Sequence, residues 1–183
     1  MAQSRIIALA TSDGPTLTAA AAASCLPTNV PWTLPAGYWQ VGRMWRLTAT
    51  GRISCVITTP GTARFDLRMG SVTVFDTLAI PLNIVAKTNV PWHLEVLLTC
   101  RAAGSSTSTT LIGQGMWFSE ANINTAIPST GPGPGGTMVP YNTAPAVGTG
   151  FDCQAAQAWD FRFTQTVATG SCTLHQILVE ELT

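Results

Sequence analysis

The residues best suited to acid–base or metal chemistry are the histidines His93 and His175, the only two in a chain of 183 residues. Each falls in a stretch with the alternating pattern of a β-strand. No motif of a serine hydrolase, a zinc protease or a nucleotide-binding loop surrounds either of them. Because His93 lies on the polar side of its stretch, we favour exposure to solvent or to an interface over catalysis.

Paired carboxylates would permit glycoside hydrolysis or calcium binding, and a hairpin could bring Asp66 and Asp76 together. Arg64 and Arg68 explain both carboxylates more simply, as ion-pair partners across strands. The other acidic residues are scattered and form no calcium-loop pattern. We therefore predict no enzymatic activity, no metal site and no cofactor.

The cysteines are five in number, lie tens of residues apart and form no zinc or redox motif. An export signal is not expected, because the apolar stretch 6–10 is shorter than the roughly 7–15 residues of a signal core. Without export there is no oxidising compartment for disulfides. We predict that the cysteines are small buried hydrophobic side chains: Cys25, Cys55, Cys100, Cys153 and Cys172.

Charge is scarce: 10% of the residues are charged, against roughly 25% in ordinary soluble domains. Nine basic and nine acidic residues balance, and Lys87 is the only lysine. With 46% hydrophobic residues the chain is too apolar to be disordered. No basic patch favours a nucleic-acid partner, and no apolar run is long enough for a membrane span. A surface with so little charge favours contact with other protein surfaces.

The elements that must position these residues are strands, because apolar residues recur with period two from about residue 43 onward. We predict strands at 44–50, 53–58, 63–69, 72–75, 92–101, 109–119, 158–167 and 173–181. A type II turn is expected at 59–62, with Gly61 at the third position. The best candidate for a helical turn is 153–159, with Asp152 as its N-cap. The fold class is all-β, a jelly-roll-like antiparallel β-sandwich, although an immunoglobulin-like strand order would give the same pattern.

The chain divides by composition into an extended N-terminal arm, residues 1–40, and a sandwich domain, residues 41–183. The arm is rich in Ser, Thr, Pro and Ala, with apolar patches at 6–9 and 26–34 that could add a strand to a neighbour. The longest irregular region, 127–150, contains a Gly- and Pro-rich core, and loops of this kind are functional or disordered. The pentapeptide 28–32 recurs at 88–92, either by duplication or by convergence on one way of starting a strand.

Aromatic residues are the most informative about function, since six tryptophans are many for a domain of this size. Tryptophan, tyrosine, methionine and arginine are enriched in protein interfaces and lysine is depleted, as in this chain. Core packing and a sugar-stacking platform are the alternatives. The candidate interface residues are Ile6, Ile7, Leu9, Leu26, Trp32, Tyr38, Trp39 and Trp45.

Three stretches, 46–62, 82–92 and 141–152, resemble a group of small structural proteins of tailed bacteriophages and prophages. The resemblance covers residues 40–183 and rests on sheet and turn residues, with no active site among them. It implies a β-sandwich in the virion, a decoration or cement protein on the capsid surface, made in the cytoplasm of the bacterial host. The partners implied are further copies of the chain, as a trimer, and the major capsid protein.

The alternative is adhesion: a tail or head-fibre protein that binds a host receptor or glycan through the 127–150 loop and exposed tryptophans. In the cement hypothesis the arm carries attachment. Deleting residues 1–35 is then expected to abolish binding to the capsid and to leave a folded oligomer.

Overall fold

The computed structural model describes residues 4–28, 30, 33–123 and 135–182, and this part of the chain contains twelve strands and no helix. The strands are β1 (Ser4–Leu9), β2 (Ala23–Ser24), β3 (Thr33–Leu34), β4 (Met44–Cys55), β5 (Thr62–Met69), β6 (Val72–Asp76), β7 (Ile80–Pro81), β8 (Lys87–Ala102), β9 (Thr110–Ser119), β10 (Gly135–Val139), β11 (Gln157–Gln165) and β12 (Ser171–Leu182).

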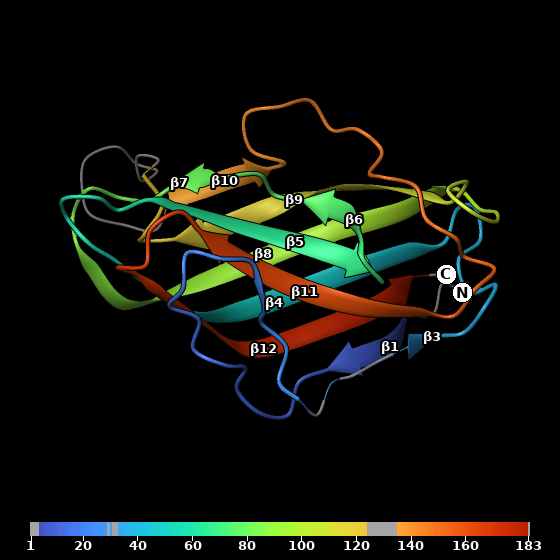
Figure 1. Ribbon diagram of the computed structural model, residues 1–183, viewed down its shortest axis with the longest axis horizontal. Coiled ribbons are helices and arrows are strands. Elements are labelled where there is room, and N and C mark those ends of the chain that lie inside the picture. The colour runs from blue at the N-terminus through green and yellow to red at the C-terminus, as the bar shows by residue number, and fades with distance from the viewer. Residues whose placement is uncertain (1–3, 29, 31–32, 124–134, 183) are drawn as a thin grey trace.

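The strands form two antiparallel sheets packed face to face (Figure 1). The larger sheet has the order β1-β12-β4-β8-β9-β10, and the smaller has the order β2-β11-β5-β6. In addition, the short strand β3 pairs with β11, and the short strand β7 pairs with β5. In Figure 1, β5 and β11 cross in front of β8 and β4. The prediction of an all-β antiparallel sandwich is confirmed, and the strand order, which the alternating pattern left open, is now defined.

Side chains of the long central strands point alternately into the core and outward. Along β4 and β8 every second residue is buried between the sheets and the intervening ones face outward. The two strands predicted at 44–50 and 53–58 are in fact the single strand β4, which passes through Gly51 without turning. A side chain at Gly51 would come within 2.0 Å of the Thr173 carbonyl oxygen and 2.9 Å of the Trp92 ring. This glycine therefore permits close approach within the sandwich and does not mark a turn.

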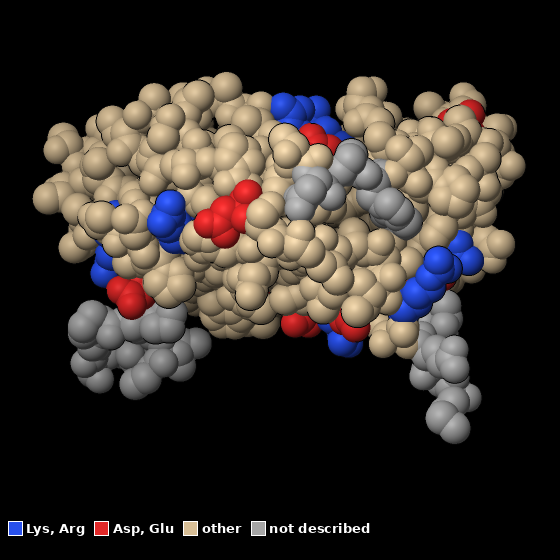
Figure 2. Space-filling model, turned by 90° about the horizontal axis from the view of Figure 1, so that it is seen from below, with Lys and Arg blue, Asp and Glu red and all other residues tan. Residues whose placement is uncertain are grey.

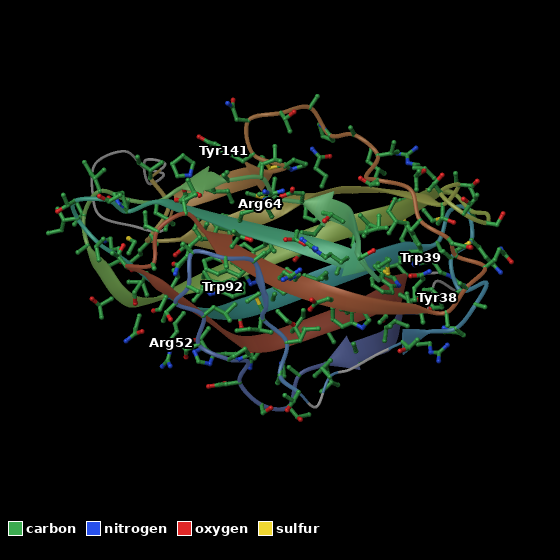
Figure 3. The ribbon with its side chains drawn as sticks, viewed as in Figure 1. Tyr38, Trp39, Arg52, Arg64, Trp92 and Tyr141 are labelled. Atoms are coloured by element: carbon green, nitrogen blue, oxygen red, sulfur yellow. The ribbon has the colours of Figure 1, made fainter. Side chains whose placement is uncertain are left out.

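The core contains two aromatic groups, one toward each end of the sandwich. Tyr38, Trp39, Trp45 and Trp159 pack edge to face or tilted against one another, with ring centroids 4.7–6.3 Å apart. The second group surrounds Phe65, which contacts the rings of Trp92, Trp117, Phe161 and Phe163. Figure 3 shows Tyr38 and Trp39 near one end and Trp92 near the other. Together these rings join residues from both sheets along the length of the molecule.

The N-terminal segment folds back onto the body of its own chain. β1 pairs with β12, while β2 and β3 pair with β11. Between β1 and β2, backbone hydrogen bonds from residues 10, 14 and 17 continue along β12. Cys25 and Leu34 are fully buried in the core. Both predicted domains therefore contribute to the same sheets, and the role of this segment as an arm that reaches a neighbour stays a prediction.

Two local predictions have different outcomes. Gly61 adopts a φ of +72°, as the predicted turn at 59–62 requires. The helical turn predicted at 153–159 is wrong, since β11 begins at Gln157. The Asp152 side chain does accept a hydrogen bond from the backbone N–H of Gln154 at 2.8 Å, but this stabilises a bend that leads into the strand.

The repeated pentapeptide and the long loop lie partly outside the described residues. Of the first copy, 28–32, residues 29, 31 and 32 are outside, as is the stretch 127–134 of the loop. The second copy, 88–92, lies within β8, where Asn89 has a φ of +52° and its N–H donates to the Ser54 hydroxyl at 2.9 Å. Trp92 is buried, as expected of the residue that anchors this strand. The loop region also contains β10, which extends the larger sheet.

All five cysteines are free and buried, which confirms that they act as small hydrophobic side chains. Burial raises the pKa of the Cys25 and Cys172 thiols, because a thiolate would lose its hydration there. The folded protein therefore holds these two thiol protons more tightly than the unfolded chain does.

We predict that the free energy of unfolding falls as the pH rises above about 8.5, where unfolded cysteines begin to ionise. Below that pH both states carry the proton and the contribution of the two thiols is fully present. Urea unfolding followed by fluorescence at neutral and alkaline pH measures this change. Cys172→Ala should flatten the pH dependence, and an equally steep dependence in this variant would contradict the assignment.

Candidate binding face

The outer face of the smaller sheet is occupied by ion pairs. Arg64 Nε on β5 donates to Asp76 Oδ1 on the neighbouring strand β6, at 2.9 Å. Arg68 Nε donates to Asp66 Oδ1 within β5, at 2.6 Å. Asp66 and Asp76 are opposite each other in the β5–β6 register. The hairpin does bring these two carboxylates together, and an arginine pairs with each. The Arg64–Asp76 pair crosses between strands as predicted, whereas the Arg68–Asp66 pair lies within β5. This arrangement fits a structural role better than acid–base chemistry, which needs a carboxyl group free to exchange its proton.

The outer face of the larger sheet is different, because exposed apolar side chains from β8, β9 and β10 lie on it beside polar and charged ones. Leu97 of β8 is 40% exposed and Met138 of β10 is 53% exposed. Met116 and Phe118, on the intervening strand β9, are also open to solvent. We call the outward side of β4, β8, β9 and β10 the grooved face. Its side chains are Met44, Arg46, Thr48, Thr50, Arg52, His93, Glu95, Leu97, Thr99, Arg101, Ile112, Gln114, Met116, Phe118 and Met138.

Three hollows follow one another along the grooved face. The first, of about 480 Å³, contains His93 and Phe118, and a second of about 210 Å³ shares both residues. The third, of about 380 Å³, shares Leu97 and Met116 with the second. The hollows are therefore neighbours on one surface, which could hold an extended partner or a side chain from another protein.

Both histidines line the first hollow, which the sequence did not predict. A bulge in β12 at His175 interrupts its pairing with β4 and places the ring beside the hollow. Asp13 Oδ1 lies 2.8 Å from His175 Nδ1, and the His93 ring lies 6.5 Å from that of Phe118. The two histidines meet because β12 and β8 both flank β4. No sequence signal indicates this order of strands, so their proximity could not be predicted.

The first hollow has polar groups beside its two histidines. Thr50 and Gln176 contribute polar groups beside the histidines, and Glu120 is 3.6 Å from the ammonium group of Lys87. Across the described residues, no group of three or more His, Cys, Asp or Glu side chains could hold a metal ion. The hollow combines an aromatic ring with several donors and acceptors, an arrangement that suits a polar ligand with an apolar face.

The predicted interface residues lie in different environments. Ile6 and Leu9 are exposed on the outward side of β1, and Ile7, Leu26 and Tyr38 are partly buried. Trp39 and Trp45 lie in the core, which corrects the expectation of an interface role for these two residues. They were misassigned because the sequence pattern cannot distinguish a tryptophan between two sheets from one between two subunits. Trp32 lies outside the described residues.

Tyr38 is engaged in a network within the chain. Its hydroxyl donates to Glu181 Oε2 at 2.9 Å and accepts a hydrogen bond from Trp45 Nε1 at 2.8 Å. Arg43 Nε lies 2.9 Å from Glu181 Oε1, and its guanidinium lies over the Tyr38 ring. Burial raises the pKa of Tyr38, so the hydroxyl keeps its proton. The network attaches the segment before β4 to the last strand.

Charged atoms elsewhere on the surface are sparse, and Figure 2 shows only small separate groups of them on one edge of the sandwich. None of the described residues forms a helix long and apolar enough to cross a membrane. Comparisons with protein families, with curated proteins and with solved structures find no match to this chain. The argument for function therefore depends on the sequence and on the surfaces described above.

The assignment of the grooved face is testable with two adjacent leucines of β8. Leu97→Ala should change the free energy of unfolding by no more than about 0.5 kcal/mol, because the side chain is on the surface. Leu98→Ala should lower it by about 2–5 kcal/mol, because Leu98 is fully buried between the sheets. Urea unfolding of both variants gives the comparison, and equal losses would contradict the assignment.

Proposed function

We propose that this chain is a structural protein of a bacteriophage virion, a capsid decoration or cement protein that self-associates and binds the major capsid protein on the outer surface of the head. The observation that carries the proposal is the contrast between the two outer faces. On the smaller sheet the charged side chains pair with one another. On the larger sheet apolar side chains remain exposed, as expected of a surface that contacts other proteins.

The resemblance of residues 40–183 to small phage structural proteins supplies the virion context and a trimer as the expected assembly. It also supplies the localisation, with synthesis in the bacterial cytoplasm and residence on the capsid. Five free, buried cysteines are compatible with a protein made in a reducing compartment. The arrangement needs no cofactor, because cementing requires only binding.

Strand β1 is the segment best placed for attachment to the capsid. It lies at the end of the larger sheet, and its second edge has no partner strand among the described residues. Ile6 and Leu9 are the exposed apolar side chains of this strand. An exposed edge with apolar side chains can add a strand from a neighbouring protein.

The structure also improves the deletion experiment suggested by the sequence. Removing residues 1–35 would delete β1, β2 and β3 together with the buried side chains of Cys25 and Leu34. We expect that deletion to unfold the protein, so loss of attachment would not identify the contact. Point substitutions in β1 avoid this difficulty because Ile6 and Leu9 face outward.

We predict that the double variant Ile6→Asp, Leu9→Asp stays folded and loses attachment to empty capsids of the phage that carries this protein. The charged side chains would have to be buried against the capsid. Cosedimentation with capsids measures occupancy. The matched control is Ile57→Asp, Ile84→Asp, which changes two isoleucines outside β1 that are at least as exposed as Ile6 and Leu9, and it should bind normally. Unchanged occupancy of the β1 variant would contradict this contact.

A second candidate function, adhesion to a host receptor or glycan, is favoured by the hollow that holds His93, His175 and Phe118. Its aromatic and polar lining could bind a sugar. The five tryptophans that the structure describes are buried and offer no exposed ring: Trp39, Trp45, Trp92, Trp117 and Trp159.

If adhesion is the function, the purified protein should bind a glycan array or host cells saturably, and Phe118→Ala should abolish that binding. The cementing function predicts binding to capsids and no saturable binding to cells or glycans. A protein that binds cells but not capsids would contradict the proposed function.

A further inference from the structure

Two opposite charges on the grooved face form no ion pair with any other residue that the structure describes. Most charged side chains form ion pairs in the described part of the protein, and Asp152 and Glu95 are the only acidic exceptions. Glu95 is exposed on β8, and Arg101, also exposed and without an ion pair, follows on the same strand. Both line hollows of the grooved face.

Between these charges the surface has a protrusion beside a hollow. Leu97 projects from β8 and is 40% exposed. The adjacent hollow of about 380 Å³ extends past Thr99 to Met44 and Ile112, and Arg101 lies at its rim. Along β8 the order is therefore acid, apolar protrusion, hollow and base. When two copies of this strand run in opposite directions, the acid of each copy meets the base of the other, and the protrusion of each meets the hollow of the other.

We propose that a second copy of this chain docks on the grooved face through a two-fold axis that crosses β8 between Leu97 and Thr99. The axis lies in the plane of contact, perpendicular to the strand, so β8 of one copy runs antiparallel to β8 of the other. It places Leu97 of each copy over the Thr99 hollow of its partner. The same operation places Glu95 of each copy opposite Arg101 of the other, so one operation satisfies both shape and charge.

The remaining groups of the face are compatible with this arrangement. The strand order is preserved along the axis, so the apolar side chains of β9 lie over β9 of the second copy. Arg46 and Glu180 neutralise each other within one chain, at 3.8 Å. Four strands present a surface on the order of 500 Å² per copy, less than the roughly 800 Å² per partner of a standard interface. The dimer should therefore be weak and depend on concentration.

The inference rests on the self-association in the proposed function and is independent of capsid attachment, which uses β1. It replaces the trimer expected from the resemblance by a pair of copies in solution. The two contacts can be measured separately, because dimerisation needs only the purified protein.

Charge reversal tests the proposal. Sedimentation velocity over a wide concentration range should show a monomer–dimer equilibrium for the natural chain. Glu95→Arg and Arg101→Glu should each weaken the dimer at least about tenfold, because each places like charges opposite each other twice. The double variant Glu95→Arg, Arg101→Glu exchanges the charges and should restore the natural affinity. The matched control is Arg52→Glu, which should have no effect. Arg52 is an exposed arginine of β4, seven residues along that strand from Trp45, the residue paired with Leu98 at the level of the axis.

Circular dichroism establishes that each variant is folded. A natural chain that stays monomeric or forms a trimer would overturn the proposal, as would a double variant that does not recover. Capsid cosedimentation of the single variants distinguishes the two contacts, since loss of the dimer with retained attachment leaves the proposed function intact.

Discussion

The burial of aromatic rings between two antiparallel sheets is the constraint on which the rest of this structure depends. Phe65 and the rings around it join the sheets at one end, and Trp45 with its neighbours joins them at the other. Successive side chains of a strand point to opposite faces. A buried residue of β4 or β8 therefore places the next residue along the strand on the outer surface. With only 10% charged residues in the chain, there are few charges for two outer faces. Ion pairs occupy one face. On the other, exposed apolar side chains lie beside Glu95, Arg101 and the Arg46–Glu180 pair.

The sequence was sufficient to predict the long strands and the all-β class. Period-two patterns located β4, β5, β6, β8, β9, β11 and β12, and the cysteines were correctly predicted to be buried. It was not sufficient for features that depend on strand order. The proximity of His93 and His175 requires that β4 lie between β8 and β12, which local pattern does not encode. Trp39 and Trp45 were placed at an interface because the composition of an interface resembles that of a core. Gly51 falls between two stretches that were predicted as separate strands, whereas it lies in one continuous strand and permits close contact inside the sandwich.

The functional account follows from the placement of binding groups and not from catalytic chemistry. The segment before β4 is fixed to β12 by Tyr38 and Glu181, so the N-terminal strands form part of a rigid body. This rigid body offers an apolar strand edge at β1 and a grooved face on β8 to β10, on separate parts of the larger sheet. One surface can serve attachment while the other serves self-association, and a cement protein needs both.

The central claim, that this chain covers a capsid, is tested most directly by its copy number in purified virions. Quantitative mass spectrometry against the major capsid protein gives this number. Decoration of the capsid lattice predicts on the order of hundreds of copies in a fixed ratio to the capsid subunits. A handful of copies, or none, would contradict the account and favour a tail or fibre location.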